Sequence, residues 1–108
     1  MMENNQFVIY RLKNIPENHD IRCRPYEVLQ RKHIQIRYEN YEKKYKGWLL
    51  SADTPDSLRE RLNRQVSQRS RGCSIHISDV LVLKRNGKIA AYYAEKERFI
   101  IIDRFING

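Results

Sequence analysis

The segment from Gly72 to Arg85 constrains the fold of this chain more than any other. Apolar and polar residues alternate from Cys73 to Ser78, which is typical of a strand with one buried face. The alternation stops at Ser78-Asp79, and Val80 to Leu83 is continuously apolar, as in a strand buried on both faces. We therefore predict a central strand over residues 74–84, with a bulge or bend at Ser78-Asp79.

A tight hairpin is predicted directly after this strand. Asn86-Gly87 suits a type I′ turn, which needs positive φ at both central residues. The next strand, Lys88–Ala94, should then return along Val80–Arg85. The predicted register places Lys88 opposite Arg85, Ala90 opposite Leu83 and Tyr92 opposite Leu81.

Two more strands and a short helix are predicted from the remaining pattern. The strands cover Phe7–Lys13 and Phe99–Phe105, and the short helix lies near Pro25–Lys32. Residues Arg22–Arg24 are expected to be extended, because a proline follows them. The C-terminal strand is apolar, so it lies either inside the sheet or at an edge that invites dimerisation.

The longest helix is predicted over Thr54–Gln68. Thr54 is a good N-cap and Pro55 suits the first helical position. The helix carries a narrow apolar stripe, formed by Leu58, Leu62 and Val66. We expect this stripe to pack on the sheet, where adjacent Ala90 and Ala91 leave room for it.

These elements predict one α+β domain over residues 1–108. The sheet is mostly antiparallel, with a C-terminal β-meander and two or three short helices packed on it. With 108 residues, the chain is long enough for one modest core.

The net charge of +8 gives the main expectation about partners. Such a surface attracts nucleic acid, anionic membrane or an acidic protein patch. No apolar run reaches the roughly 20 residues that span a bilayer, and no signal peptide is visible, so we expect a cytoplasmic protein. Cys23 and Cys73 are expected to be reduced residues that serve packing.

Aromatic and basic residues are interleaved between Asn40 and Leu50. Tyr41 and Tyr45 are four residues apart, so a helical turn would place them on one face, ending near Gly47. The favoured interpretation is aromatic cover over the core. The alternative is that these tyrosines form a platform on which bases stack, among Lys43, Lys44 and Lys46.

The longest predicted helix and the residues after it hold the densest positive charge in the chain, formed by Arg59, Arg61, Arg64, Arg69 and Arg71. One interpretation is a solvated helix back. The other is a surface that contacts phosphates or carboxylates while the apolar stripe docks on the sheet.

One polar cluster invites comparison with enzymes, and it consists of Ser74, His76, Ser78 and Asp79. Side chains two residues apart on a strand are about 7 Å apart, which is too far for a Ser–His hydrogen bond. We expect Ser78 or Asp79 to hold a bend through side-chain to backbone bonds. We predict no enzyme activity, no metal or cofactor, and no small-molecule ligand. An enzyme would need a pocket that gathers His76, Asp79 and a tyrosine.

Three segments carry a resemblance to a known family. Asn40–Leu49 resembles an Asn-Tyr-Asp-x-Val-Tyr-x-Gly-x-Leu signature, and Tyr92–Phe99 resembles Tyr-Tyr-Val-Asp-Ser-x-Gly-Phe. Leu62-Asn63 followed by Gly72–Leu81 resembles Phe-Asn … Gly-x-Ser-Leu-Ser-Val-Ser-Asp-Val-Val. In this order they resemble the YodL-like domain family of Firmicutes, which occurs alone and as a module in large proteins of plasmids, conjugative elements and phages.

The resemblance implies a family whose biochemical role is not established, so it supplies no activity. Three positions depart from the family pattern: His76 replaces a serine, Glu95 an aspartate and Arg98 a glycine.

Two functions are therefore expected from different classes. The first is a non-enzymatic interaction module that contacts an acidic protein or itself. It predicts that Trp48 or the tyrosines adjoin arginines, because Trp, Tyr and Arg dominate interface energetics. The family resemblance adds the expectation of an association with mobile elements. The second is a nucleic-acid binder without sequence preference, which uses the five arginines named above.

Overall fold

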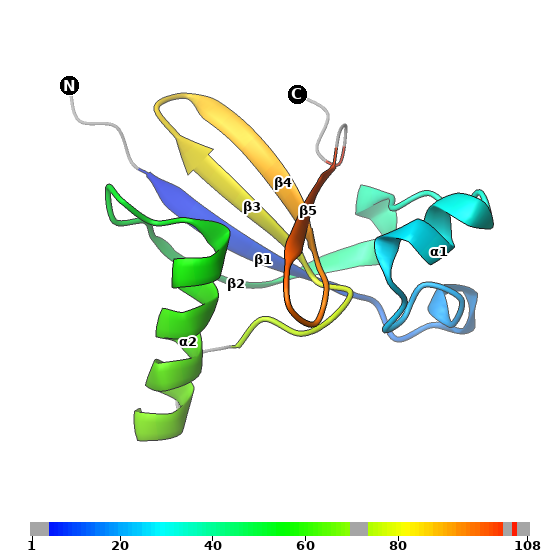
Figure 1. The fold of residues 1–108 in the computed structure, drawn as a ribbon, viewed down its shortest axis with the longest axis horizontal. Coiled ribbons are helices and arrows are strands. Elements are labelled where there is room, and N and C mark those ends of the chain that lie inside the picture. The colour runs from blue at the N-terminus through cyan, green and yellow to red at the C-terminus, as the bar shows by residue number, and fades with distance from the viewer. Residues whose placement is uncertain (1–4, 70–73, 103–104, 106–108) are drawn as a thin grey trace.

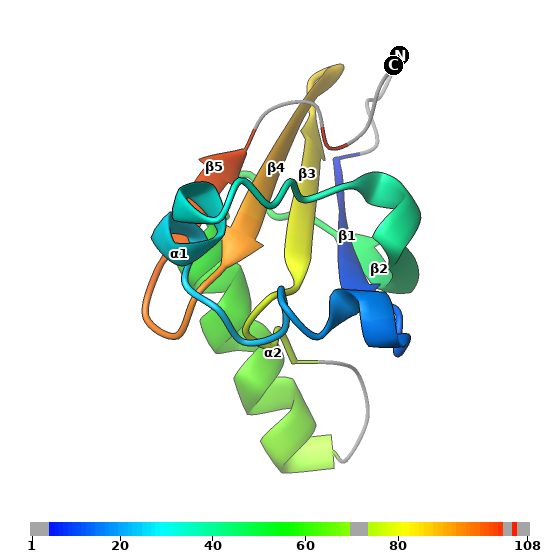
Figure 2. The same ribbon diagram turned by 90° about the vertical axis from the view of Figure 1, so that its right-hand side faces the viewer.

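Five strands form one antiparallel sheet in the order β2-β1-β3-β4-β5 (Figures 1 and 2). The computed structural model describes residues 5–69, 74–102 and 105. The strands are β1 (Gln6–Leu12), β2 (Tyr41–Trp48), β3 (Val80–Arg85), β4 (Lys88–Ala94) and β5 (Phe99–Ile102). The helices are α1 (Tyr26–Arg31) and α2 (Pro55–Arg69), with 3-10 turns at Pro16–Asn18 and Tyr38–Asn40. The predicted α+β class is confirmed.

Each face of the sheet has its own hydrophobic core, and β1 contributes to both because its side chains alternate. Val8, Tyr10 and Leu12 pack with Leu29 of α1 on one face. Phe7 and Ile9 pack on the other face with α2, through Leu58 and Leu62. The two helices thus lie on opposite sides of the sheet (Figure 1).

The β3–β4 hairpin has the predicted register. Arg85 pairs with Lys88, Leu83 with Ala90 and Leu81 with Tyr92. The turn residues Asn86 and Gly87 have φ values of 52° and 77°, as a type I′ turn requires.

The start of α2 is also as predicted. The Thr54 hydroxyl accepts a hydrogen bond from the Ser57 amide at 3.1 Å, and the Ser57 hydroxyl accepts one from the Thr54 amide at 2.9 Å. This reciprocal pair caps two free amides at the helix start. Leu58 and Leu62 are buried and Val66 is half-buried, but the alanine in their cluster is Ala94 rather than the pair at 90–91.

The prediction of a strand before Ser78 is wrong for the residues that the structure describes there. Residues 74–79 form an irregular segment and a turn, and Gly72 and Cys73 lie outside the described residues. The bend at Ser78-Asp79 is confirmed, because Ser78 has a φ of 81°. The positive φ of Ser78 turns the chain before β3 begins, and the pairing of β1 with β3 accordingly ends at Tyr10 and Val80.

The predicted helical turn at Tyr41–Tyr45 is wrong, because the segment is strand β2 on an edge of the sheet. Pairing with β1 from Gln6 to Leu12 satisfies the backbone groups that a short isolated helix would leave poorly bonded. A bulge puts Tyr45 opposite Ile9 and Lys43 opposite Tyr10, so Lys44 is the extra residue.

Other predictions need smaller corrections. Arg22–Cys23 belong to a turn rather than an extended segment, and Cys23 has a φ of 61°. Cys23 is exposed, so it is not a packing residue, and Cys73 lies outside the described residues. The C-terminal strand ends at Ile102 and is an edge, although Phe105 is buried beyond it. Neither described helix is long and apolar enough to cross a bilayer.

Candidate functional site

Asp79 is the charged centre of the turn before β3. Its side chain accepts hydrogen bonds from Nε and Nη2 of Arg11 at 3.0 and 2.8 Å, and from the His76 amide at 2.8 Å. The same arginine reaches the Ser74 carbonyl at 2.9 Å. Asp79 therefore closes its own turn and ties that turn to β1, which explains how a carboxylate can be buried there.

Ser78 joins three parts of the chain at the neighbouring position. Its hydroxyl accepts the Cys23 amide and donates to the Ile21 carbonyl at 3.3 Å. Its backbone carbonyl accepts the Tyr41 hydroxyl at 2.8 Å, and its Oγ lies 3.3 Å from the Tyr93 hydroxyl. The turn thus holds the 21–23 segment, β2 and β4 together.

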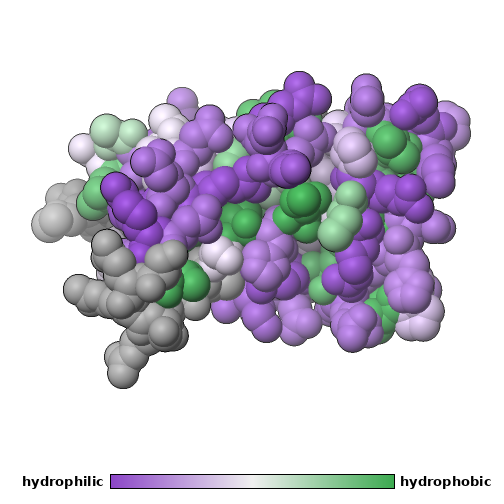
Figure 3. Space-filling model, turned by 60° about the horizontal axis from the view of Figure 1, so that its bottom comes forward, coloured by the Kyte–Doolittle hydropathy of each residue, from purple (hydrophilic) through white to green (hydrophobic). Residues whose placement is uncertain are grey.

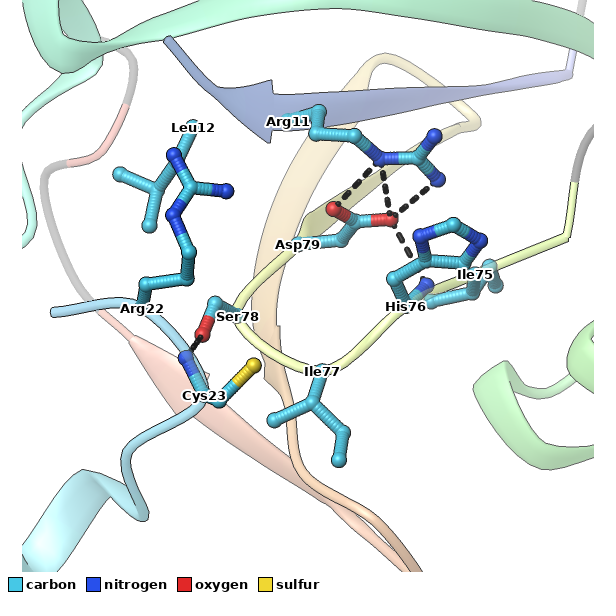
Figure 4. A pocket seen from close by; sticks show the side chains of 9 residues that line it. All are labelled: Arg11, Leu12, Arg22, Cys23, Ile75, His76, Ile77, Ser78 and Asp79. Atoms are coloured by element: carbon cyan, nitrogen blue, oxygen red, sulfur yellow. Dashed lines mark hydrogen bonds and ion pairs between the residues drawn. The ribbon is translucent and has the colours of Figure 1, made fainter. Parts of the chain in front are cut away.

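A pocket of ≈ 410 Å³ opens beside this turn (Figure 4). It is lined by Arg11, Leu12, Arg22, Cys23, Ile75, His76, Ile77, Ser78 and Asp79. Cys23 and Ile77 also line a second pocket of ≈ 520 Å³, whose far wall is the Glu95–Arg98 turn.

The first pocket gathers His76 and Asp79, but the nearby tyrosines bond elsewhere. Tyr41 and Tyr93 both bind Ser78, and Asp79 is occupied by Arg11 and the His76 amide. These contacts anchor the turn. In the described part of the chain, His, Cys, Asp and Glu form no group of three or more that could hold a metal ion.

Burial changes the ionisation of three tyrosines in the core. Desolvation, and then the neighbouring Tyr38, raises the pKa of Tyr10 to about 12. Desolvation also raises the pKa of Tyr41, with smaller effects from Tyr93 and Asp79. The pKa of Tyr93 is raised by burial although its contact with Ser78 opposes the shift. All three therefore keep their protons to a higher pH than an exposed tyrosine would.

The turn between β4 and β5 holds Glu95 and Arg98. Burial opposes ionisation of Glu95, but hydrogen bonds from Arg98 at 2.8 Å and from the Tyr26 amide at 2.7 Å outweigh it and lower the Glu95 pKa. Arg98 thus pairs with Glu95 across the turn, and Glu95 also holds the start of α1.

The three predicted aromatic site residues have different surroundings. Tyr41 is buried in the core on the α1 side, whereas the bulge at Lys44 turns Tyr45 to the α2 side. Trp48 ends β2 and is 63% exposed. The structure therefore does not bring the two tyrosines together, and Trp48 alone among the three is open to a partner.

The arginines that were predicted to form one basic surface on α2 make different contacts. Arg59 lies over the Phe99 ring at 4.3 Å and donates to the Lys96 carbonyl, and burial lowers its pKa. Arg61 pairs with the buried Asp53 at 3.0 Å and donates to the Trp48 carbonyl at 3.3 Å.

The remaining arginines differ in what the structure describes. Arg64 is exposed, only the backbone of Arg69 is described, and Arg71 lies outside the described residues. On the face that Figure 3 shows, apolar side chains form small separate patches in a hydrophilic surface. Because of their contacts with Phe99 and Asp53, Arg59 and Arg61 serve the packing of the chain itself.

A row of side chains that sequence reasoning missed crosses the sheet at its hairpin end. Trp48 pairs with Gln6, Gln6 with Lys84, and Lys84 with Ile89, so all four lie on one face. Ile89 is 54% exposed, and exposed Lys46 lies two residues before Trp48 on the same face. We call Lys46, Trp48, Lys84 and Ile89 the Trp48 surface. This surface could have been predicted only from the pairing of β1 with β2 and β3.

Comparison with known proteins supplies a family. No curated protein and no solved structure matches the chain. Residues 6–105 match the YodL-like domain. This range includes all five strands and both helices. The chain therefore belongs to the YodL-like domain family.

Proposed function

We propose that this protein is a non-enzymatic interaction module that binds an acidic protein partner through the Trp48 surface. The observation that carries the proposal is a largely exposed tryptophan beside Lys46, at the end of a row that also holds Lys84. Tryptophan is among the residues that most often dominate binding energy. A tryptophan that served only packing would be covered by the core.

Charge indicates the chemistry of the partner. The chain carries +8, and no acidic residue belongs to the cross-strand row. Lys46 and Lys84 would meet carboxylates of the partner while Trp48 and Ile89 supply apolar contact. Trp48 and Ile89 lie at the two ends of the row, with Gln6 and Lys84 between them, so apolar and polar contacts would be made side by side.

The rigid support of Trp48 favours binding. Its carbonyl accepts a hydrogen bond from Arg61, which is itself fixed by Asp53. The arginine thus supports the backbone at Trp48. A surface held in its bound geometry loses less conformational entropy when a partner arrives.

The test is a titration with poly-L-glutamate, followed by the fluorescence of Trp48, the single tryptophan. We expect saturable binding that the double variant Lys46→Glu/Lys84→Glu weakens at least about tenfold. The control, Lys13→Glu/Lys32→Glu, changes the net charge equally at exposed positions outside the Trp48 surface. Equal losses in both variants, or no binding at low salt, would overturn the proposal.

Nucleic acid is the competing partner, because exposed Arg64 and the net charge would also attract phosphates. The same titration with an oligothymidylate decides between them. Binding of the oligonucleotide that Arg64→Glu abolishes and Lys46→Glu/Lys84→Glu leaves intact would favour the arginine surface instead. A cytoplasmic location, an association with mobile elements and the lack of enzyme activity stay predictions.

A further inference from the structure

The two edges of the sheet are protected to different degrees. Exposed Lys43, Lys44 and Lys46 lie on the β2 edge, which also has a bulge. Charged side chains and bulges are devices by which natural proteins prevent strand pairing at an edge. Strand β5 reads Phe-Ile-Ile-Ile and has none of these devices from Phe99 to Ile102. Figure 2 shows these strands at opposite ends of the sheet.

Hydrogen bonds at the end of β4 establish which backbone groups of β5 face outward. The Ala94 amide donates to the Asp79 carbonyl, and the Ala94 carbonyl accepts the Ser78 amide, so both groups of Ala94 point toward the β3 side. Bonding direction alternates along an antiparallel strand, so both groups of Tyr93 point toward β5. Tyr93 pairs with Ile100. The N–H and C=O of Ile101 consequently point away from β4.

The side chain of Ile101 also lacks cover. It is 64% exposed, the highest value among the large apolar residues of the described chain. Its partner in β4 is Tyr92, which belongs to the face that α2 covers. No described strand pairs with the outer side of β5. Backbone bonding groups and an apolar side chain therefore lie at the same open position.

We propose that two copies of this chain associate by antiparallel pairing of β5 with β5, with Ile101 opposite Ile101 of the second copy. A two-fold axis perpendicular to the sheet keeps each face continuous, so the residue on the axis must oppose itself. With Ile101 on the axis, its outward N–H and C=O bond their counterparts, and Ile100 faces Ile102. The ten strands of the pair form one sheet.

The net charge of the chain predicts how its self-association depends on salt concentration. Two copies that each carry +8 repel one another, and added salt screens that repulsion. Self-association should therefore strengthen as salt rises. Binding of a polyanion at the Trp48 surface should weaken under the same change, so the two proposals fail or succeed independently.

The first experiment measures mass against concentration by sedimentation equilibrium for the full chain. We expect a monomer–dimer equilibrium whose dissociation constant rises at least about tenfold in Ile101→Lys, because that change removes an apolar contact and adds like charges at the axis. The control is Leu50→Lys, which alters another exposed apolar residue outside β5 and the Trp48 surface. A monomer throughout, or equal effects of both variants, would overturn the proposal.

The second experiment tests the register. Opposed residues in a bonded antiparallel pair have Cα atoms about 5.5 Å apart, which lies within the range of disulfides. In a Cys23→Ser/Cys73→Ser background, Ile101→Cys should form a disulfide-linked dimer on mild oxidation, while Leu50→Cys should not. A dimer that forms in solution without this cross-link would contradict strand pairing at Ile101 and indicate another interface.

Discussion

Asp79 is a charged residue with 1% exposure, which is unusual unless the charge is paired and hydrogen-bonded. Arg11 supplies the opposite charge at 2.8 Å and keeps part of its own side chain in water. The pair spans β1 and the turn before β3, which are far apart in the sequence. A single carboxylate thus links the local shape of a turn to the pairing of strands.

Replacing Asp79 by Ala should lower the free energy of unfolding by about 3 kcal/mol. This is near the low end for removing one partner of a buried ion pair, because Arg11 can still be hydrated. The measurement is urea denaturation followed by Trp48 fluorescence. Glu60→Ala, at an exposed position on α2, is the control and should change stability little. A loss below about 1 kcal/mol in the Asp79 variant would mean that the ion pair does not hold the turn.

Stability should decrease at alkaline pH because Tyr10, Tyr41 and Tyr93 have raised pKa values in the folded chain. The unfolded chain ionises near pH 10, whereas the folded tyrosines stay protonated. The stabilisation is therefore complete below pH 10 and is lost as the pH rises through the folded value, about 12 for Tyr10.

Urea denaturation at a series of pH values checks this sign. Tyr41→Phe removes one of the buried hydroxyls and its bond to Ser78, so it should lower stability at pH 8 yet reduce the further loss above pH 10. An unchanged slope in the variant would show that Tyr41 does not contribute to the alkaline loss.

At the scale of elements, Gly87 and Gly47 are each needed for a different physical reason. Gly87 in the hairpin turn has a φ of 77°, and an added Cβ would meet nothing within 4 Å. Gly47 in β2 is needed for steric reasons instead, because an added Cβ would lie 2.8 Å from Cε1 of the buried Phe7 ring.

We expect Gly87→Ala to cost about 1 kcal/mol, from backbone strain alone. Gly47→Ala should cost about 1–3 kcal/mol, because the Phe7 ring must shift in a packed core. Thermal and urea unfolding measure both. Phe7→Leu provides a further check, because it should relieve the clash and make the Gly47→Ala change less costly in that background. Additive effects of the two changes would contradict the contact.

Local signals in the sequence predicted several elements correctly. Asn86-Gly87 defined both the turn and its register, and Thr54 with Pro55 defined the start of α2. These signals depend on backbone conformation within a few residues, so no distant part of the chain can change them. The same reason explains why Ser78-Asp79 was recognised as a bend.

Predictions that depended on distant partners were less accurate. Tyr41 and Tyr45 have helical spacing, but β1 offers an open edge that makes the segment a strand. The 74–79 segment alternates as a strand does, but its backbone turns at Ser78, where φ is positive, and β1 pairs with β3 only from Val80 onward. Arg11 then bonds the Ser74 carbonyl and the Asp79 side chain bonds the His76 amide, two backbone groups that strand pairing would otherwise have bonded.

The candidate site could be predicted only in part for the same reason. Trp48 was identified from its residue type and its basic surroundings. Lys84 and Ile89 join it only through the strand order β2-β1-β3-β4, which no local pattern contains. Arg59 and Arg61 were grouped by charge, whereas the fold uses each of them for contacts on a different side of α2.

At the scale of the whole molecule, we propose separate tasks for separate surfaces. The Ser78-Asp79 turn holds the fold together, whereas the Trp48 surface is proposed to bind an acidic partner and β5 to pair with a second copy. The net charge of +8 acts on the last two in opposite ways, through attraction to an acidic partner and repulsion between copies. Salt dependence therefore distinguishes the two interactions without a mutation.

The most direct test of the central claim is a two-dimensional NMR titration of the nitrogen-15-labelled chain with poly-L-glutamate. The single Trp48 gives one indole N–H signal, which reports on the proposed surface by itself. We predict that this signal and the amide signals of Lys46, Lys84 and Ile89 shift together and saturate, and that Lys46→Glu/Lys84→Glu removes the effect. Shifts concentrated at Arg59 and Arg64 of α2, or a Trp48 signal that does not move, would contradict the account.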